Sequence, residues 1–336
     1  MEKKVIVKVE DVSIKFSLAS EKFDGFKEYF IQRVKKKITY QDFWALQDVS
    51  FKVYKGETLG LVGESGCGKT TTGRSLLRLY EPTAGKIIYD DQVIFDSENK
   101  IAVDMLPYRK KMQIVFQDPY SSLDPRETIG KSLEEVLQIQ GRKQGCREKV
   151  LETLELVGLS SEVYDRYPHE FSGGQRQRVG IARALILNPV FLVCDEPVSA
   201  LDVSVQAQIV NLLKKIQRER KLASIFISHE INVVRYISDR IVVMYLGHIV
   251  EEAPKDELIH HPKHPYTKSL LASVPNMNPR ERKRHVALEG EIPSPMDPPS
   301  GCVFHTRCPY ATDKCRTEVP EYKESGDGHW VRCHEV

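Results

Sequence analysis

The chain has 336 residues, enough for two domains or for one large domain with an appendix. Hydrophobic residues make up 41% and charged residues 29%, proportions that exclude wholesale disorder. The net charge of +2 argues against a dedicated nucleic-acid-binding protein. The longest apolar run, residues 241–250, is too short to span a bilayer, and the first residues lack the apolar core of a signal peptide. We therefore expect a cytoplasmic protein.

Alternating apolar residues near the N-terminus predict strands at residues 4–16 and 44–53. Between them lies a basic, aromatic insert at about residues 20–40. Its apolar side chains Phe23, Phe26, Phe30 and Val34 share one helical face. We expect an amphipathic helix packed on its own domain; a helix facing a membrane or a partner is the alternative.

Later segments predict strands alternating with helices. Apolar runs at residues 58–63, 190–194 and 223–228 predict buried strands, and residues 204–221 between the last two predict a helix. Residues 126–166 have a charge-rich helical pattern. This alternation predicts a parallel sheet with helices on its faces. Prolines and charges dominate after about residue 252, so we place a domain boundary near residue 255, giving domains 1–255 and 256–336.

Residues 63–70, GESGCGKT, match the pattern of a phosphate-binding loop between a strand and a helix. Glycines permit the tight turn, and the backbone N–H groups converge on phosphate oxygens at the positive end of the helix. Lys69 is expected to bridge the β- and γ-phosphates, and the Thr70 hydroxyl to ligate Mg²⁺.

An acidic pair, Asp195 and Glu196, lies at the end of the predicted buried strand in FLVCDE, residues 191–196. Asp195 is suited to the Mg²⁺ shell, and Glu196 to polarising a water molecule for in-line attack on the γ-phosphate. In the absence of a phosphate loop, an ordinary turn would explain the pair equally well.

Residues 172–175, SGGQ, open a predicted helix with two adjacent glycines. Such glycines weaken a helix but allow its backbone to approach an anion. A second anion-binding helix start suggests that ATP is bound from two sides.

Together these motifs resemble those of ATP-binding cassette (ABC) ATPases. Further matches are Gln117 in VFQDP, SALD at residues 199–202, and His229 in ISHE. The resemblance implies a P-loop NTPase fold: a RecA-like core, an antiparallel β subdomain, and a helical subdomain at about residues 120–170. It also implies a head-to-tail dimer with ATP between one protomer's phosphate loop and the other's SGGQ segment.

The resemblance assigns roles residue by residue. The expected catalytic residues are Glu196, His229 and Gln117. The expected Mg²⁺ ligands are Thr70, Gln117 and Asp195. Closure of the dimer acts on membrane helices through the region around Gln117 and Tyr120. Phe16 matches the adenine-stacking position. The other nucleotide contacts are Gly63, Glu64, Ser65, Gly66, Cys67, Gly68, Lys69 and Thr71, with Ser172, Gly173, Gly174, Gln175 and Asp202 acting from the opposite protomer.

Four cysteines crowd the last tenth of the chain: Cys302, Cys308, Cys315 and Cys333. In a reducing compartment such a group indicates metal ligation before disulfides. Four neighbouring thiolates suit an iron–sulfur cluster or a tetrahedral zinc, and the spacing does not choose between them.

The cysteine series and the segments HPKHPYTKSLLASVP and GEIPSPMDPPSGC resemble the C-terminal extension of dipeptide/oligopeptide importer ATPases, in their F-type subunit. That resemblance implies a 4Fe–4S cluster, which we expect to act as a structural clip. It also implies two transmembrane permease subunits and a second ATPase, either a D-type paralogue or a copy of this chain. An extracytoplasmic solute-binding protein acts indirectly, and nucleic acid is not a partner.

We therefore expect a peripheral ATPase at the cytoplasmic face of the inner membrane that energises peptide import. Related importers serve oligosaccharides or nickel complexes, which are the alternative cargoes. A soluble ABC ATPase outside transport and a non-hydrolytic regulatory subunit are the remaining alternatives. The single cassette opposes the first of these, and Glu196 with His229 opposes the second.

Overall fold

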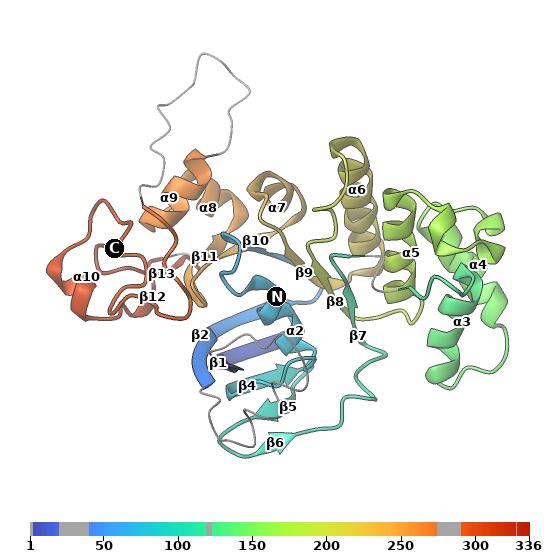
Figure 1. Ribbon diagram of the computed structural model, residues 1–336, viewed down its shortest axis with the longest axis horizontal. Helices are drawn as coiled ribbons and strands as arrows, with labels where there is room; N and C mark the ends of the chain where they lie inside the picture. The colour runs from blue at the N-terminus through green and yellow to red at the C-terminus, as the bar shows by residue number, and fades with distance from the viewer. Residues whose placement is uncertain (1–2, 20–39, 119–122, 274–289, 327) are drawn as a thin grey trace, which may run out of the picture.

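The computed structural model describes residues 3–19, 40–118, 123–273, 290–326 and 328–336. Two sheets organise this part of the chain (Figure 1). The predicted amphipathic insert and Tyr120 lie outside the described residues. Within them, no helix combines the length and apolar character needed to cross a bilayer.

The first sheet is antiparallel, in the order β2-β1-β4-β5-β6. Its long pair, β1 and β2, contains both strands predicted near the N-terminus, because alternating side chains bury one face of each strand. The five strands are β1 (Val5–Ala19), β2 (Tyr40–Tyr54), β4 (Ala84–Tyr89), β5 (Gln92–Asp96) and β6 (Ile101–Ala102).

The second sheet has eight strands, in the order β12-β13-β11-β10-β3-β9-β8-β7. The five from β10 to β7 are parallel, and β11, β13 and β12 continue the sheet in antiparallel pairs. Their bounds are β3 (Thr58–Val62), β7 (Met112–Val115), β8 (Phe191–Asp195), β9 (Ala223–Ile227), β10 (Arg240–Tyr245), β11 (His248–Pro254), β12 (Tyr322–Glu324) and β13 (Trp330–Arg332).

The central strands β3, β8 and β9 are buried on both faces, as their continuous apolar sequences require. Helices α3, α4 and α5 gather at the end of the molecule near β7, opposite the C-terminal strands (Figure 1). The larger helices are α2 (Lys69–Leu76), α3 (Ile129–Ile139), α4 (Cys146–Leu156), α5 (Gly173–Leu185), α6 (Val203–Arg220), α7 (Ile231–Ile237), α8 (Lys255–His260), α9 (Pro265–Ala272) and α10 (Asp313–Thr317), with short 3-10 turns η1 (Ser161–Asp165) and η2 (Pro168–Glu170).

The expected boundary near residue 255 falls between β11 and α8. The chain beyond it does not form a separate layer, because β13 pairs with β11 through Val331 opposite Glu251 and Trp330 opposite Glu252. The C-terminal region therefore shares the main sheet with the nucleotide-binding core.

Candidate nucleotide site

The phosphate loop joins β3 to α2, and two of its glycines are dictated by geometry. Gly63 has φ of +152°, and a Cβ there would lie 2.2 Å from the carbonyl oxygen of Met244. Gly68 has φ of +101° and would bring a Cβ within 2.8 Å of the carbonyl oxygen of Ala45. Only glycine fits both positions, so the loop lies tightly against β2 and β10.

Lys69, the first residue of α2, is buried. Its Nζ donates to the carbonyl oxygens of Gly63 at 2.8 Å and Glu64 at 3.0 Å, which holds the ammonium group inside the loop. Ser65 and Gly66 form the exposed tip, and Thr71 follows in the first turn of the helix. The positive end of α2 and the lysine charge therefore occupy one small volume, which suits a polyphosphate.

Thr70 and Asp195 are joined although 125 residues separate them in sequence: Thr70 Oγ1 donates to Asp195 Oδ1 at 2.7 Å. Asp195 is fully buried at the end of β8, and burial raises the pKa of its carboxyl group. Arg74 lies 3.7 Å away, yet Asp195 Oδ2 has no hydrogen-bond partner among the described residues. A hydroxyl and an under-satisfied carboxylate are the hard oxygen donors that Mg²⁺ prefers, so these residues fit that ion.

Glu196, Gln117 and His229 meet at the carboxyl ends of three adjacent parallel strands, β8, β7 and β9. Gln117 Nε2 donates to Glu196 Oε2 at 3.2 Å, and His229 Nδ1 lies 3.4 Å from the same oxygen. Glu196 has φ of +45°, a left-handed conformation that is uncommon for a non-glycine residue. The three predicted catalytic side chains are thus brought together.

The SGGQ segment forms the N-terminus of α5. Ser172 is the N-cap: its Oγ accepts the N–H of Gln175, and the Gln175 side-chain oxygen accepts the N–H of Ser172 in return. Gly174 packs against α6, since a Cβ there would lie 2.4 Å from a Val205 methyl group. Asp202 caps α6 by accepting the N–H groups of Ser204 and Val205, and the Ser204 hydroxyl donates to the same carboxylate at 2.6 Å. The hydroxyl bond most of all, together with the N–H bonds, holds the pKa of Asp202 below its ordinary value.

Phe16 lies near the end of β1 and is half-buried. Its ring packs 5.8 Å from Phe43 and edge-on at 5.6 Å from Tyr80. On the neighbouring strand Trp44 is 40% exposed and carries Lys15 over its ring. Sequence reasoning did not consider this exposed tryptophan as an aromatic platform.

The four C-terminal cysteines lie in one region, all as free thiols. Burial raises the pKa of Cys302 to about 11, and the neighbouring thiols of Cys315, Cys333 and Cys308 add to the increase. In the described ranges, however, no group of three or more His, Cys, Asp or Glu side chains is arranged to hold a metal ion. The structure therefore gives the predicted 4Fe–4S cluster, and its zinc alternative, no support.

Sequence reasoning missed a contact between the C-terminal region and the phosphate loop. Arg307 forms a two-pronged ion pair with Glu64, and the hydroxyl of Tyr266 accepts the Glu64 N–H at 2.9 Å. No sequence motif signals these partners, which lie more than 200 residues from the loop.

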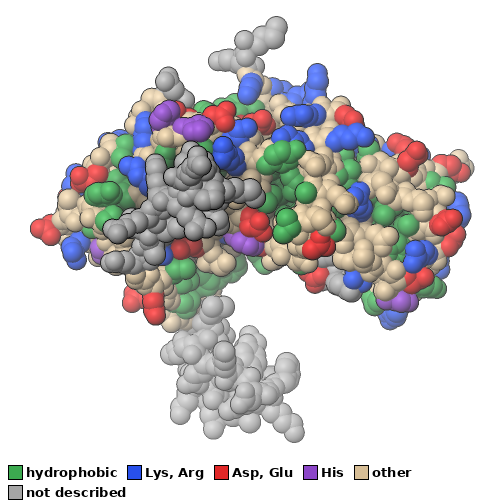
Figure 2. Space-filling view, turned by 90° about the horizontal axis from the view of Figure 1, so that it is seen from above, with side chains coloured by type: hydrophobic (Ala, Val, Ile, Leu, Met, Phe, Trp, Pro, Cys, Tyr) green, Lys and Arg blue, Asp and Glu red, His purple; other side chains and the backbone are tan. Residues whose placement is uncertain are grey.

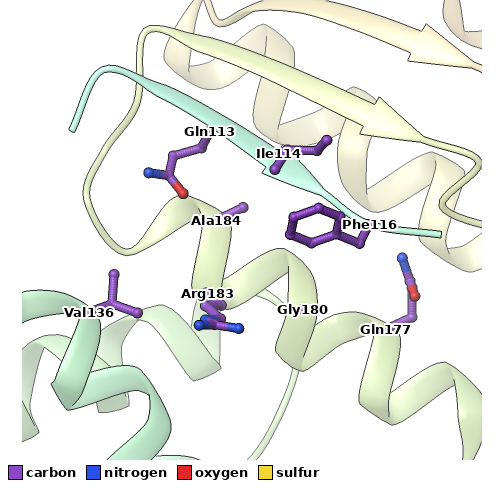
Figure 3. A pocket seen from close by; sticks show the side chains of 8 residues that line it. All are labelled: Gln113, Ile114, Phe116, Val136, Gln177, Gly180, Arg183 and Ala184. Carbon is purple, nitrogen blue, oxygen red and sulfur yellow. The ribbon is translucent and has the colours of Figure 1, made fainter. Parts of the chain in front are cut away.

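A groove opens beside Gln117, between β7, α3 and α5 (Figure 3). Its volume is about 210 Å³, and half-exposed Phe116, Val136 of α3 and Arg183 of α5 line it. Gln177 of α5 also faces it; this side chain is 2% exposed, and its Nε2 has no hydrogen-bond partner among the described residues. Apolar and polar side chains therefore share one concave surface next to the site.

Two family models match the chain: "ABC transporter" over residues 46–199, and "Oligopeptide/dipeptide transporter, C-terminal region" over residues 250–315. With the phosphate loop, the acidic pair and the fold above, they define an ABC cassette, an ATP-hydrolysing protein class. The chain belongs to the ABC transporter ATP-binding proteins, in the oligopeptide/dipeptide transporter group. The resemblance found in the sequence is thereby confirmed.

Curated relatives extend over most of the chain. It is 52% identical to the oligopeptide transport ATP-binding protein AppF of Bacillus subtilis, covering 87% of this chain and 90% of the relative. It is 48% identical to the dipeptide transport ATP-binding protein DppF of Haemophilus influenzae, covering 93% and 95%. A putative peptide import ATP-binding protein of Brucella ovis is 53% identical, covering 86% and 90%.

Solved structures confirm the cassette fold. The cassette MJ0796, a dimer bound to ADP and Pi in a post-hydrolysis state, superposes with a TM-score of 0.60 at 28% identity. That match covers 74% of this chain and 99% of MJ0796. CbiO1 of Clostridium perfringens, part of the transporter complex cbiONQ, gives the same TM-score at 25% identity, covering 77% and 92%.

Proposed function

We propose that this chain energises the import of di- or oligopeptides by binding and hydrolysing ATP at the cytoplasmic face of the membrane. The observation that carries the transport assignment is the C-terminal region typical of oligopeptide/dipeptide transporters, joined to a cassette about half identical to peptide-transport ATP-binding proteins. Oligosaccharides and nickel complexes are the alternative cargoes, because related importers serve them.

The proposed chemistry follows from the contacts at the strand ends. Lys69 and the loop N–H groups bind the β- and γ-phosphates. Thr70, Asp195 and Gln117 would hold Mg²⁺, which would neutralise charge on the phosphates. Glu196 accepts a proton from the attacking water, and Gln117 fixes the direction of its carboxylate. His229, beside the same oxygen, contacts the γ-phosphate and stabilises the transition state.

Half of each nucleotide pocket comes from a second cassette in this proposal, either a D-type paralogue or a copy of this chain. At the start of α5, Ser172 and Gln175 form the capping box, and the backbone N–H groups of Gly173 and Gly174 between them face the γ-phosphate bound by the opposite protomer. Asp202 crosses the same interface. The dimeric MJ0796 cassette with ADP and Pi supports this arrangement. Phe16, packed against Phe43 and Tyr80, stacks on the adenine.

The groove of Figure 3 is the proposed docking site for one of the two permease subunits, and the second cassette docks the other. A short cytoplasmic helix with an apolar residue against Phe116 and Val136 and an acceptor for the Gln177 amide fits its lining. Because Phe116 is covalently next to Gln117, a displacement of Phe116 in the groove also displaces Gln117 at the hydrolytic site. An extracytoplasmic solute-binding protein acts through the permeases.

Reconstitution with the permease subunits and the second cassette tests the function. We expect ATP hydrolysis to rise when a peptide-loaded binding protein is added, and labelled peptide to accumulate inside the vesicles. Phe116→Ser should abolish this stimulation while leaving the hydrolysis of the isolated cassettes within about twofold. Stimulation by an oligosaccharide or nickel complex but not by peptide would reassign the cargo. Absence of any permease association would reject transport.

The predicted 4Fe–4S cluster enters no step of this function. Iron and acid-labile sulfide measured in an anaerobic preparation, against zinc in the same sample, test the cysteine prediction directly. A preparation that contains no iron, sulfide or zinc would mean that the four cysteines are free thiols without a metal.

A further inference from the structure

The C-terminal region is bound to the phosphate loop by a contact that the proposed chemistry does not use. Arg307 Nη1 lies 2.7 Å from Glu64 Oε2, and Nη2 lies 3.1 Å from Oε1. The Arg307 side chain is only 5% exposed. Hydrogen bonding to Glu64 raises the pKa of this guanidinium further. A paired, two-pronged contact of this kind fixes the direction of the carboxylate as well as its position.

The backbone of Glu64 is held as well. Its N–H donates to the hydroxyl of fully buried Tyr266 at 2.9 Å, and its carbonyl oxygen accepts from Lys69 Nζ at 3.0 Å. The C-terminal region thus holds the carboxylate and the N–H of one loop residue, while the phosphate-binding lysine holds its carbonyl group. Glu64 is therefore the point at which the C-terminal region and the loop's lysine meet.

The residues that hold Glu64 are themselves supported by a packed aromatic cluster. The rings of Tyr245, Tyr266 and Phe304 lie 4.8 to 5.4 Å apart. Tyr245 ends β10, the neighbour of β3 from which the loop emerges. Arg307 is tied to the cluster by its N–H bond to the carbonyl of Phe304 and by a 3.4 Å bond to the Tyr245 hydroxyl. Both residues that hold Glu64 are therefore packed against β10 through these rings.

We propose that Arg307 and Tyr266 are positioning residues for ATP, through which the C-terminal region sets the affinity of the phosphate loop for nucleotide. A glycine-rich loop must order its N–H groups toward the phosphates, and that ordering reduces the affinity unless it is made before binding. Because the C-terminal region fixes Glu64 from outside the loop, part of this ordering of the loop is made before ATP binds. Neither residue contacts Glu196, so the effect falls on binding rather than on the hydrolytic step.

The test measures the Kd for MgATP on the full-length chain, and KM and kcat of the assembled cassette pair. Arg307→Gln should raise Kd and KM about tenfold, with kcat at saturation within about twofold, because one charge-assisted contact is lost. Arg307→Lys, which keeps the charge, should restore part of the affinity. In a double-mutant cycle, Glu64→Gln combined with Arg307→Gln should be no weaker than the worse single variant.

A matched control is Arg240→Gln. Arg240 is also largely buried, and it pairs with Glu57 at 3.3 Å and Glu252 at 3.1 Å, away from the loop. This variant should lower the melting temperature and leave the Kd for MgATP unchanged. Tyr266→Phe keeps the ring and removes only the acceptor of the Glu64 N–H, so it should weaken binding about threefold even if Arg307→Gln does not fold.

Three results would overturn the proposal. One is a folded Arg307→Gln or Tyr266→Phe variant with a Kd within about twofold of the parent. Another is an equal loss of affinity in Arg240→Gln, which would assign the effect to general loosening. The third is additive loss in the Glu64 and Arg307 double variant, since independent effects would mean that the pair does not act on the loop together.

Discussion

Gln117 donates its side-chain amide to Glu196 across two neighbouring strand ends, and His229 reaches the same carboxylate oxygen from a third. The oxygen is therefore oriented by two side chains of the chain itself. Residues from three strands converge because parallel strands bring their carboxyl ends to one edge of the sheet. This convergence makes Glu196 the candidate base with the most direct structural support.

Glu196→Gln should keep ATP binding while lowering turnover at least about a hundredfold, because the amide preserves the shape of the side chain but cannot accept a proton. Nucleotide binding and single-turnover hydrolysis are measured on the same preparation. Glu219→Gln, an exposed carboxylate on α6, serves as the control and should match the parent. Near-normal turnover in Glu196→Gln would require another base.

Asp195→Asn should stabilise the nucleotide-free protein and abolish Mg²⁺-dependent hydrolysis. Burial raises the pKa of Asp195, so the folded state disfavours its charged form, and this cost is present at pH values above that pKa. Removing the charge should therefore raise the melting temperature at a pH well above that pKa. Thermal unfolding measures the first effect, and phosphate release with MgATP measures the second; a lower melting temperature in the variant would contradict the argument.

Ser172→Arg should abolish nucleotide-driven pairing of cassettes while the isolated chain still binds ATP. The side chain caps the exposed start of α5, where a long cation would block the approach of the opposite protomer. Sedimentation with MgATP, in a Glu196→Gln background that prevents turnover, measures the pairing. Ser161→Arg, exposed at the start of η1, is the matched control. Full-speed hydrolysis by a strictly monomeric Ser172→Arg chain would reject the shared pocket.

The core of this fold could be predicted from the sequence because each element carries a local signal. The buried runs of β3, β8 and β9 and the loop at residues 63–70 need only neighbouring residues to be recognised. The same holds for SGGQ, where Ser172 and Gln175 form a capping box within four residues. Such patterns predict an element and its end, and the parallel order of the sheet then brings the strand ends together.

Long-range contacts of the C-terminal region could not be predicted in the same way. Strands β12 and β13 are three residues each, too short to show alternation, and β13 finds its partner β11 only in the folded chain. Arg307 and Glu64 are 243 residues apart, and neither has a neighbour in sequence that signals the other. The cysteine spacing predicted a cluster, but spacing alone does not orient four thiols around one point.

Two buried histidines make the stability of the protein depend on pH. Burial lowers the pKa of His248 to about 4, with nearby Arg332 contributing, and burial lowers that of His264 to about 4 against an opposing effect of Glu251. Because the unfolded chain protonates these rings near pH 6.5 and the folded one does not, stability is full above pH 6.5. It is lost as the pH falls toward 4.

Each histidine should reduce the free energy of unfolding by about 2 kcal/mol between pH 7 and pH 5. Urea unfolding at the two pH values measures this. His248→Gln should remove about half of the difference, because glutamine does not titrate, and His260→Gln, an exposed site on α8, should leave it unchanged. An unchanged pH dependence in His248→Gln would mean that this ring is charged in the folded protein. Since β11, which contains His248, pairs with β13, acid is expected to loosen the C-terminal strands.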